Sequence, residues 1–198
     1  VQTLKNAFKI DRIAHAYILT GVRGIGKTTT ARLLARALNY KTNLIDKPNI
    51  EMSEIGYHCL EIMESRHIDV IEMDAASRTG IADIREIIDS INYSPSSARY
   101  KIYIIDEIHM LSKAAFNGLL KTLEEPPSHV KFIFATTEVQ KVPLTILSRC
   151  QRFDLRRFDN ELVRSLLLKV CSKENIKIDE SVIGLISRAS GGSARDSL

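Results

Sequence analysis

A glycine-rich segment near the start of the chain carries residue types that suit phosphate binding. The run Gly21-Val22-Arg23-Gly24-Ile25-Gly26-Lys27-Thr28 matches the pattern G-x-x-x-x-G-K-[ST] and continues into Thr29. Its glycines let the backbone curl so that several N–H groups can face one anion, and a following helix would add its positive N-terminal end. We expect Lys27 to reach the β- and γ-phosphates of a nucleotide and Thr28 to bind Mg²⁺. A plain glycine-rich turn is the alternative, but the strand expected before the run and the helix expected after it favour the phosphate site.

Two acidic residues, Asp106 and Glu107, follow an apolar run that ends at Ile105. An unpaired carboxylate at the end of a buried strand is costly, and a hydrated Mg²⁺ would remove that cost. We expect Asp106 to face the metal and Glu107 to face a water beside the γ-phosphate, where it would act as a base. A helix N-cap pair is the alternative interpretation, and the phosphate loop argues against it.

Four further polar residues are candidates for contact with a triphosphate. Thr136 and Thr137 end another apolar run, and one hydroxyl there could hold the attacking water or the γ-phosphate, although threonines also end strands for structural reasons. Arg149 lies on a loop before the last strand, and Arg195 lies beside a Gly-Gly pair. Most arginines are solvated surface charges, but phosphoryl transfer gains strongly from a guanidinium that neutralises developing charge.

These residues need a scaffold in which strands and helices alternate. Apolar runs predict five strands, and helical spacing of apolar residues predicts helices between them; the strands are expected at 16–20, 68–73, 101–105, 130–135 and 151–155. Nearly continuous apolar strands that alternate with helices indicate a parallel sheet covered on both faces. In such sheets ligands bind at the carboxyl ends of the strands, where the polar candidates lie.

The expected fold is therefore an α/β P-loop domain with a parallel five-stranded sheet flanked by helices, followed by a small all-helical domain. We place the first domain at residues 1–157, with an irregular insertion at about 40–58, and the second at 158–198. The first residues suggest a helix already under way and the last residues a helix just beginning, so we expect a fragment of a longer protein.

Composition narrows the class of protein without deciding it. The chain has 198 residues, a net charge of +4, 44% hydrophobic residues and 26% charged residues, which is ordinary globular usage. No apolar run approaches the ~18–20 residues that a membrane span needs, so no membrane association is expected. Three scattered cysteines, Cys59, Cys150 and Cys171, argue against a disulfide framework. The small basic excess permits a nucleic-acid partner but does not require one.

Taken together, the motifs resemble those of the AAA+ ATPases and, more narrowly, of the γ/τ subunits of bacterial clamp loaders. The resemblance runs from about His15 to the last residue. Its specific marks are AHAYILTGVRGIGKTTTAR, IEMDAASRTGI, YIIDEIHMLSKAAFNGLLKTLEEPP, KFIFATTE, KVPLTILSRCQRF and GGSARDSL. The phosphate loop alone would indicate only an NTPase, whereas Ser-Arg-Cys narrows the class to clamp loaders and Asp-Ala-Ala-Ser to γ/τ.

The resemblance implies a role for each candidate. Lys27 and Thr28 would be the Walker A pair, and Asp106 and Glu107 the Walker B residues. Thr136 or Thr137 would be sensor 1, and the sequence does not choose between them. Arg195 would be sensor 2, which contacts the γ-phosphate from the chain's own helical lid. Arg149 would be an arginine finger that acts on ATP held by a neighbouring subunit.

The resemblance also implies a function and partners. The chain would bind and hydrolyse ATP with Mg²⁺ in the bacterial DNA polymerase III holoenzyme, loading the sliding clamp on primed DNA during replication without being the polymerising subunit. Its partners would be other clamp-loader subunits in a pentameric ring, the sliding clamp, primer–template DNA and the replicative polymerase. The location would be the bacterial cytoplasm, in association with the nucleoid. The lid would be truncated at its C-terminus.

The resemblance leaves some alternatives open. Another AAA+ DNA-processing motor, such as a Holliday-junction branch-migration motor, would share the fold, and so would a nucleotide-binding scaffold subunit that does not turn over in isolation. Relatives commonly carry a four-cysteine zinc module after the first helix, but residues 40–58 contain no cysteine and only Cys59 matches. One thiolate with His58 and His67 does not make a tetrahedral structural site, so no zinc is expected.

Overall fold

The centre of the structure is a parallel β-sheet. A computed structural model describes residues 2–78 and 80–198, and within them the sheet has five strands in the order β2-β3-β4-β1-β5. All neighbouring strands are parallel; they are β1 (Ala16–Thr20), β2 (Val70–Asp74), β3 (Lys101–Asp106), β4 (Val130–Thr136) and β5 (Gln151–Asp154). The register aligns Thr20 with Thr136 and Asp74 with Asp106, so the carboxyl ends meet along one edge. The expected fold class is confirmed.

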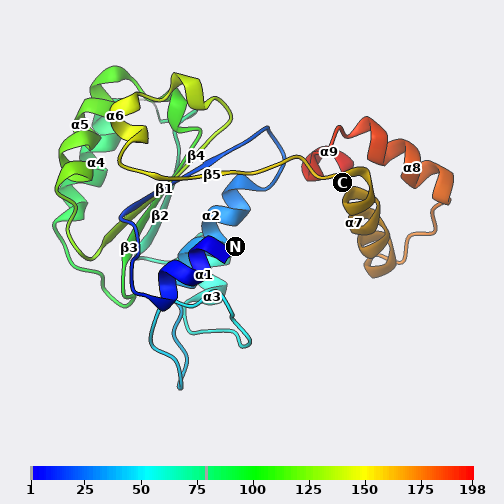
Figure 1. Ribbon diagram of the computed structural model, residues 1–198, viewed down its shortest axis with the longest axis horizontal. Coiled ribbons are helices and arrows are strands. Elements are labelled where there is room, and N and C mark those ends of the chain that lie inside the picture. Colours follow the sequence, from blue (N-terminus) through cyan, green and yellow to red (C-terminus); the bar gives the residue numbers. More distant parts are fainter. Residues whose placement is uncertain (1, 79) are drawn as a thin grey trace.

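Helices cover both faces of this sheet (Figure 1). On one face lie α1 (Gln2–Lys9), α2 (Lys27–Leu38) and α3 (Cys59–Met63). On the other lie α4 (Ile81–Ile91), the 3-10 turn η1 (Ile108–Met110), α5 (Lys113–Glu124) and α6 (Leu144–Leu147). A second 3-10 turn, η2 (Val139–Lys141), follows β4.

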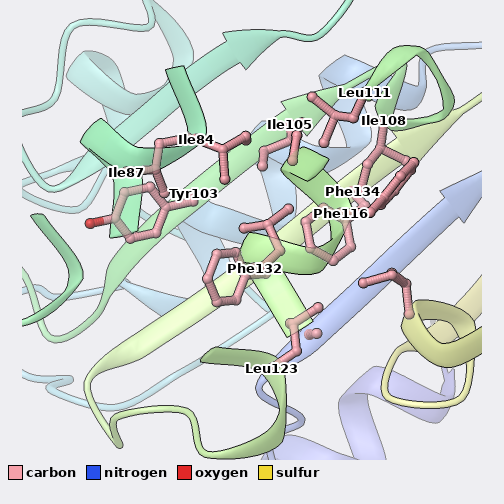
Figure 2. Close-up of a cluster of buried hydrophobic side chains, with 14 of the residues drawn as sticks. Ile84, Ile87, Tyr103, Ile105, Ile108, Leu111, Phe116, Leu123, Phe132 and Phe134 are labelled. Atoms are coloured by element: carbon pink, nitrogen blue, oxygen red, sulfur yellow. The ribbon is translucent and has the colours of Figure 1, made fainter. Parts of the chain in front are cut away.

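The alternation of side chains along the strands builds a core on each face. Every residue of β1 and β4 is buried, because successive side chains point to opposite faces and both faces are covered. Figure 2 shows the larger cluster, in which Tyr103, Phe132 and Phe134 lie side by side and contact α4 and α5. Burial of this apolar surface holds the strand ends at fixed positions.

A helical group follows the sheet and stands apart from it in Figure 1, joined by the segment after β5. It consists of α7 (Asn160–Lys173), α8 (Glu180–Ala189) and α9 (Ala194–Ser197). Asp159 caps α7 by accepting a hydrogen bond from the Leu162 N–H, and Ser193 caps α9 in the same way. Its core is small and contains Val163, Leu167 and Ile183. We refer to this group, residues 158–198, as the lid.

A buried carboxylate fixes the chain between α4 and β3. Asp69, which is 2% exposed, accepts hydrogen bonds from the backbone N–H groups of Ser96, Ser97 and Ala98. Burial alone would raise the pKa of Asp69, but these donors and the Ser97 hydroxyl together hold the pKa below its ordinary value. The carboxylate therefore contributes to folding in its charged form.

We predict that Asp69→Ala lowers the free energy of unfolding by about 2–4 kcal/mol, because three backbone donors lose their partner in a buried place. Urea unfolding at pH 7 measures the loss. The control is Asp89→Ala, which removes an exposed carboxylate of α4 and should change the free energy of unfolding by less than ~0.5 kcal/mol. Since the folded pKa of Asp69 is depressed, its contribution is present above its ordinary pKa of 3.8 and is lost as the pH falls through the lower folded value. Equal unfolding midpoints at pH 7 would contradict this role.

Candidate nucleotide-binding site

A cavity of about 510 Å³ lies at the carboxyl ends of β1 and β3, between the sheet and the lid. It is lined by residues 23–30 of the glycine-rich loop and α2, and by Asp106, Glu107, Phe158, Leu166, Ala194, Arg195 and Leu198. A second cavity of about 670 Å³ adjoins it and is lined by Val22, Arg23, Asp74, Ala76, Asp106, Glu107, His109, Met110, Thr137 and Arg195. Most of the residues singled out from the sequence therefore meet in one place.

The glycine-rich loop has the curled backbone that anion binding requires. Gly24 and Gly26 have φ angles of 79° and 86°, in the left-handed region that favours glycine. A Cβ on Gly24 would overlap the Ser193 Oγ of the lid. The Gly24 carbonyl also accepts a hydrogen bond from the Arg195 N–H at 3.2 Å. The loop and the lid are thus in direct contact at this residue.

Lys27 places a positive charge inside the loop. The side chain is nearly buried, and its Nζ donates hydrogen bonds to the carbonyl oxygens of Gly21 and Val22, each at 3.1 Å. Burial lowers the pKa of Lys27, and Glu107 and Asp106 oppose that shift. The ammonium therefore lies where a phosphate could replace weak carbonyl partners with charge-assisted hydrogen bonds.

Thr28 and Asp106 provide adjacent oxygen atoms that fit a magnesium ion. The Thr28 hydroxyl donates to the Asp106 Oδ2 at 2.5 Å, and the Asp106 Oδ1 accepts from the Glu107 N–H at 2.9 Å. Hydroxyl and carboxylate oxygens are hard ligands, and Mg²⁺ is usually bound by one or two such groups together with phosphates and waters. Within residues 2–78 and 80–198, no group of three or more His, Cys, Asp or Glu side chains is arranged to hold a metal ion.

The Glu107 side chain is fixed by the end of the neighbouring strand. Its Oε2 accepts hydrogen bonds from both the N–H and the hydroxyl of Thr137, each at 3.0 Å. Glu107 also has a φ of 47°, which costs about 1 kcal/mol for a residue with a side chain. Strain of this kind persists where the surroundings hold a residue in place, and it clusters at functional sites.

Thr136 and Thr137 have different surroundings. Thr136 is fully buried, and its Oγ1 lies 2.9 Å from the His109 Nδ1 and accepts from the Glu138 N–H at 3.1 Å. Thr137 contacts Glu107 and lines the second cavity. Thr136 is the last residue of β4 and Thr137 is the first residue beyond it, and only the Thr137 hydroxyl bonds directly to Glu107.

The two arginine candidates also differ. Arg195 lines both cavities. Arg149 lines neither of them; its Nη2 pairs with the Glu124 Oε1 at 2.6 Å, and its Nη1 donates to the Thr145 carbonyl at 2.7 Å. The chain therefore does not bring Arg149 to its own cavity.

Sequence reasoning missed several residues that line the cavities. Phe158, Leu166 and Leu198 supply apolar surface from the lid, and His109 lies beside Glu107. Leu166 belongs to the ordinary apolar pattern of α7, and Phe158 and Leu198 flank helices as single apolar residues, so nothing in the sequence sets them apart. His109 stands three residues after Asp106, and that proximity to an acidic pair is the signal that could have identified it.

Comparison with known proteins assigns the chain to a family. A family model described as "DNA polymerase III, delta subunit" matches residues 1–159. The chain belongs to this DNA polymerase III subunit family. It is 48% identical over 195 residues to DNA polymerase III subunit tau of Escherichia coli, covering 98% of this chain and 30% of the relative. It is 46% identical to subunit gamma of Buchnera aphidicola, covering 100% of this chain and 53% of the relative. The expected resemblance to γ/τ subunits is confirmed, and the chain spans about half or less of these relatives.

Solved structures support the fold of this DNA polymerase III subunit family member. The Thermotoga maritima RuvB Holliday junction branch migration motor matches with a TM-score of 0.67 and 18% identity, over 99% of this chain and 56% of that one. A DNA polymerase III gamma subunit-related protein of the same organism matches with a TM-score of 0.54 and 24% identity, over 83% of this chain and 49% of that one. The expected AAA+ P-loop fold is confirmed. In the ranges that the structure describes, no helix combines the length and apolarity needed to cross a bilayer.

We predict that Gly24→Ala weakens ATP binding at least tenfold, because the new Cβ would strain the left-handed backbone and meet the Ser193 hydroxyl. Titration with a fluorescent ATP analogue measures the affinity. Ser193→Ala on the same background removes the contacting oxygen and should restore part of the affinity. Gly184→Ala is the matched control, since a Cβ there meets no atom within 4 Å. Unchanged affinity in Gly24→Ala would show that the loop geometry is not required.

Proposed function

We propose that the chain binds ATP with Mg²⁺ and hydrolyses it. The observation that carries this proposal is the meeting, in one cavity, of a curled glycine loop, a nearly buried lysine and a hydrogen-bonded Thr28–Asp106 pair beside Glu107. The apolar lid residues Phe158 and Leu166 line the same cavity and could cover a nucleotide base. AAA+ P-loop proteins bind nucleotides, which supports the choice of ligand.

Each side chain has a defined task in this proposal. Backbone N–H groups of the loop and the Lys27 ammonium hold the β- and γ-phosphates, and Thr28 and Asp106 hold Mg²⁺. When bound, the metal ion neutralises charge on the phosphates. The Glu107 carboxylate accepts a proton from the attacking water, and the Thr137 hydroxyl, already bonded to Glu107, acts as sensor 1. Arg195 contacts the γ-phosphate from the lid. Thr29, which also lines the cavity, contacts the nucleotide together with the loop.

At the level of the whole protein, we propose a clamp-loader subunit of the bacterial DNA polymerase III holoenzyme. It would load the sliding clamp onto primed DNA, in a pentameric ring with other clamp-loader subunits and alongside the replicative polymerase, in the cytoplasm. Identities of 46 to 48% with relatives named tau or gamma support this assignment over the branch-migration motor, which is 18% identical. Contacts shared by two subunits would let ATP favour one arrangement of the ring.

Arg149 fits a role in a neighbouring subunit's site. Because its guanidinium is on the surface and absent from the chain's own cavities, it could reach ATP only across an interface. The same observation favours a second candidate function for the isolated chain, a nucleotide-binding scaffold that turns over only in an assembly. We also propose that the chain has two domains, residues 1–157 and 158–198, and that the first contains an insertion at about 40–58.

We predict that Glu107→Gln keeps ATP affinity within about threefold and lowers turnover by about 10²- to 10⁴-fold, because the base is lost while the loop is intact. Lys27→Ala should instead abolish binding, since the phosphates lose their buried cation. Nucleotide titration and steady-state phosphate release by the full-length protein in its assembly measure both. Unchanged turnover in Glu107→Gln would contradict the assignment of the base.

We predict that Arg149→Ala subunits bind ATP normally but fail to activate their neighbours. Mixing wild-type and variant subunits at several ratios should lower turnover more steeply than the wild-type fraction falls. Arg152→Ala is the matched control, because Arg152 is a nearby arginine that pairs with Asp154. Mixing wild-type subunits with Arg152→Ala subunits should leave turnover the same at every ratio. If Arg149→Ala loses ATP binding in an unmixed subunit, the arginine acts within its own site and the proposed role is wrong.

A further inference from the structure

His109 lies in a buried position that the proposed chemistry does not yet use. It stands on η1, directly after the acidic pair, and its side chain is 6% exposed. Its Nδ1 lies 2.9 Å from the Thr136 Oγ1 and 3.3 Å from the Glu107 Oε2. Its Nε2 lies 3.4 Å from the Glu138 Oε1 on the opposite side of the ring. Both ring nitrogens therefore face polar partners, and each faces a carboxylate.

The partners of His109 form a continuous polar chain from the cavity to the surface. Glu138 is partly exposed, and its Oε2 pairs with the Lys141 Nζ at 2.8 Å across η2. Thr136 accepts a hydrogen bond from the Glu138 N–H, which ties the same loop to the buried side of the ring. A buried imidazole keeps its place at low cost only if its nitrogens have polar partners. Here Nδ1 is hydrogen-bonded with the Thr136 hydroxyl, and Nε2 lies 3.4 Å from the Glu138 carboxylate.

Glu107 is held by three groups from two residues. Thr137, the first residue after β4, supplies two hydrogen bonds, and His109 supplies the third contact from η1. Nδ1 carries at most one hydrogen and its hydrogen-bond partner is the Thr136 Oγ1, so the ring touches the Glu107 carboxylate at 3.3 Å without a hydrogen bond of its own. This contact limits where the carboxylate can lie. Replacing the ring would remove this contact and free one side of the Glu107 carboxylate.

We propose that His109 is a positioning residue that fixes the Glu107 carboxylate and links it to the Glu138–Lys141 pair on the surface. This inference rests on the proposed role of Glu107 as the base. It assigns His109 no contact with the substrate, and its effect passes through Glu107. A change at the surface pair would reach the base through the ring, because one imidazole contacts both carboxylates.

The test uses two replacements of His109 in the full-length protein in its assembly. His109→Phe fills the same volume without a donor, and His109→Asn restores a donor near the position of Nδ1. We expect His109→Phe to lower kcat by about tenfold or more with ATP affinity and KM within about twofold, and His109→Asn to recover most of kcat. A residue that only fills space would show the reverse order, with Phe tolerated better than Asn.

Glu138→Gln tests the outer part of the link and does not disturb the buried ring. Glu138→Gln should lower kcat about threefold in the wild-type background. In the His109→Phe background it should cause no further loss of kcat, because the imidazole that links Glu138 to Glu107 is already absent. Glu174→Gln, an exposed carboxylate of the lid, is the control and should leave kcat unchanged.

The outcomes separate this inference from the proposed function. If the wild type hydrolyses ATP and His109→Phe matches it within twofold, the positioning role is wrong while the ATPase assignment stands. If the wild type binds ATP without hydrolysing it, both are overturned. Additive losses in the Glu138 and His109 double variant would overturn the link to the surface pair.

Discussion

The Lys27 ammonium and the carboxylates of Asp106 and Glu107 converge on one cavity, and the rest of the structure serves to hold them there. Charges at the ends of buried strands are expensive unless they find partners. Here the partners within the chain are modest ones, since Lys27 bonds to loop carbonyls and Asp106 to the Thr28 hydroxyl. A triphosphate with Mg²⁺ would supply stronger partners for all of them at once, and the proposed function rests on that fit.

The sheet and the lid contribute to this site in different ways. The parallel register brings the ends of β1, β3 and β4 to one edge. Two apolar clusters, one on each face of the sheet, keep those ends fixed, and Figure 2 shows the larger of them. The lid reaches the site through the Gly24–Arg195 hydrogen bond and the close approach of Ser193. Because the lid has its own small core, a change in the loop could alter the position of the helices without disturbing the sheet.

The strands and the glycine loop could be predicted from the sequence, because each has a pattern of neighbouring residues. Apolar runs have a local signature, so the strands expected at 101–105 and 130–135 were predicted to within one residue of β3 and β4. The glycine pattern is equally local, which is why residues 21–28 could be proposed as a phosphate loop from the sequence alone. The choice between Thr136 and Thr137 depends on which side chain each hydroxyl contacts where β4 ends, and no local pattern gives those partners. Three contacts depend on tertiary packing, and no local sequence pattern predicts them. They are the contact of His109 with Glu107, the Arg149–Glu124 ion pair and the contact between Ser193 and Gly24. The resemblance to γ/τ subunits supplied roles, whereas the structure supplied the partners of each side chain.

The most direct test of the account is a crystal structure of the chain with Mg²⁺ and a non-hydrolysable ATP analogue. We expect the β- and γ-phosphates to lie in the loop, with the Lys27 Nζ moved from the Gly21 and Val22 carbonyls onto phosphate oxygens. The metal ion should contact Thr28 directly and Asp106 directly or through water. A nucleotide bound elsewhere, or one that leaves Lys27 on the loop carbonyls, would contradict the central claim.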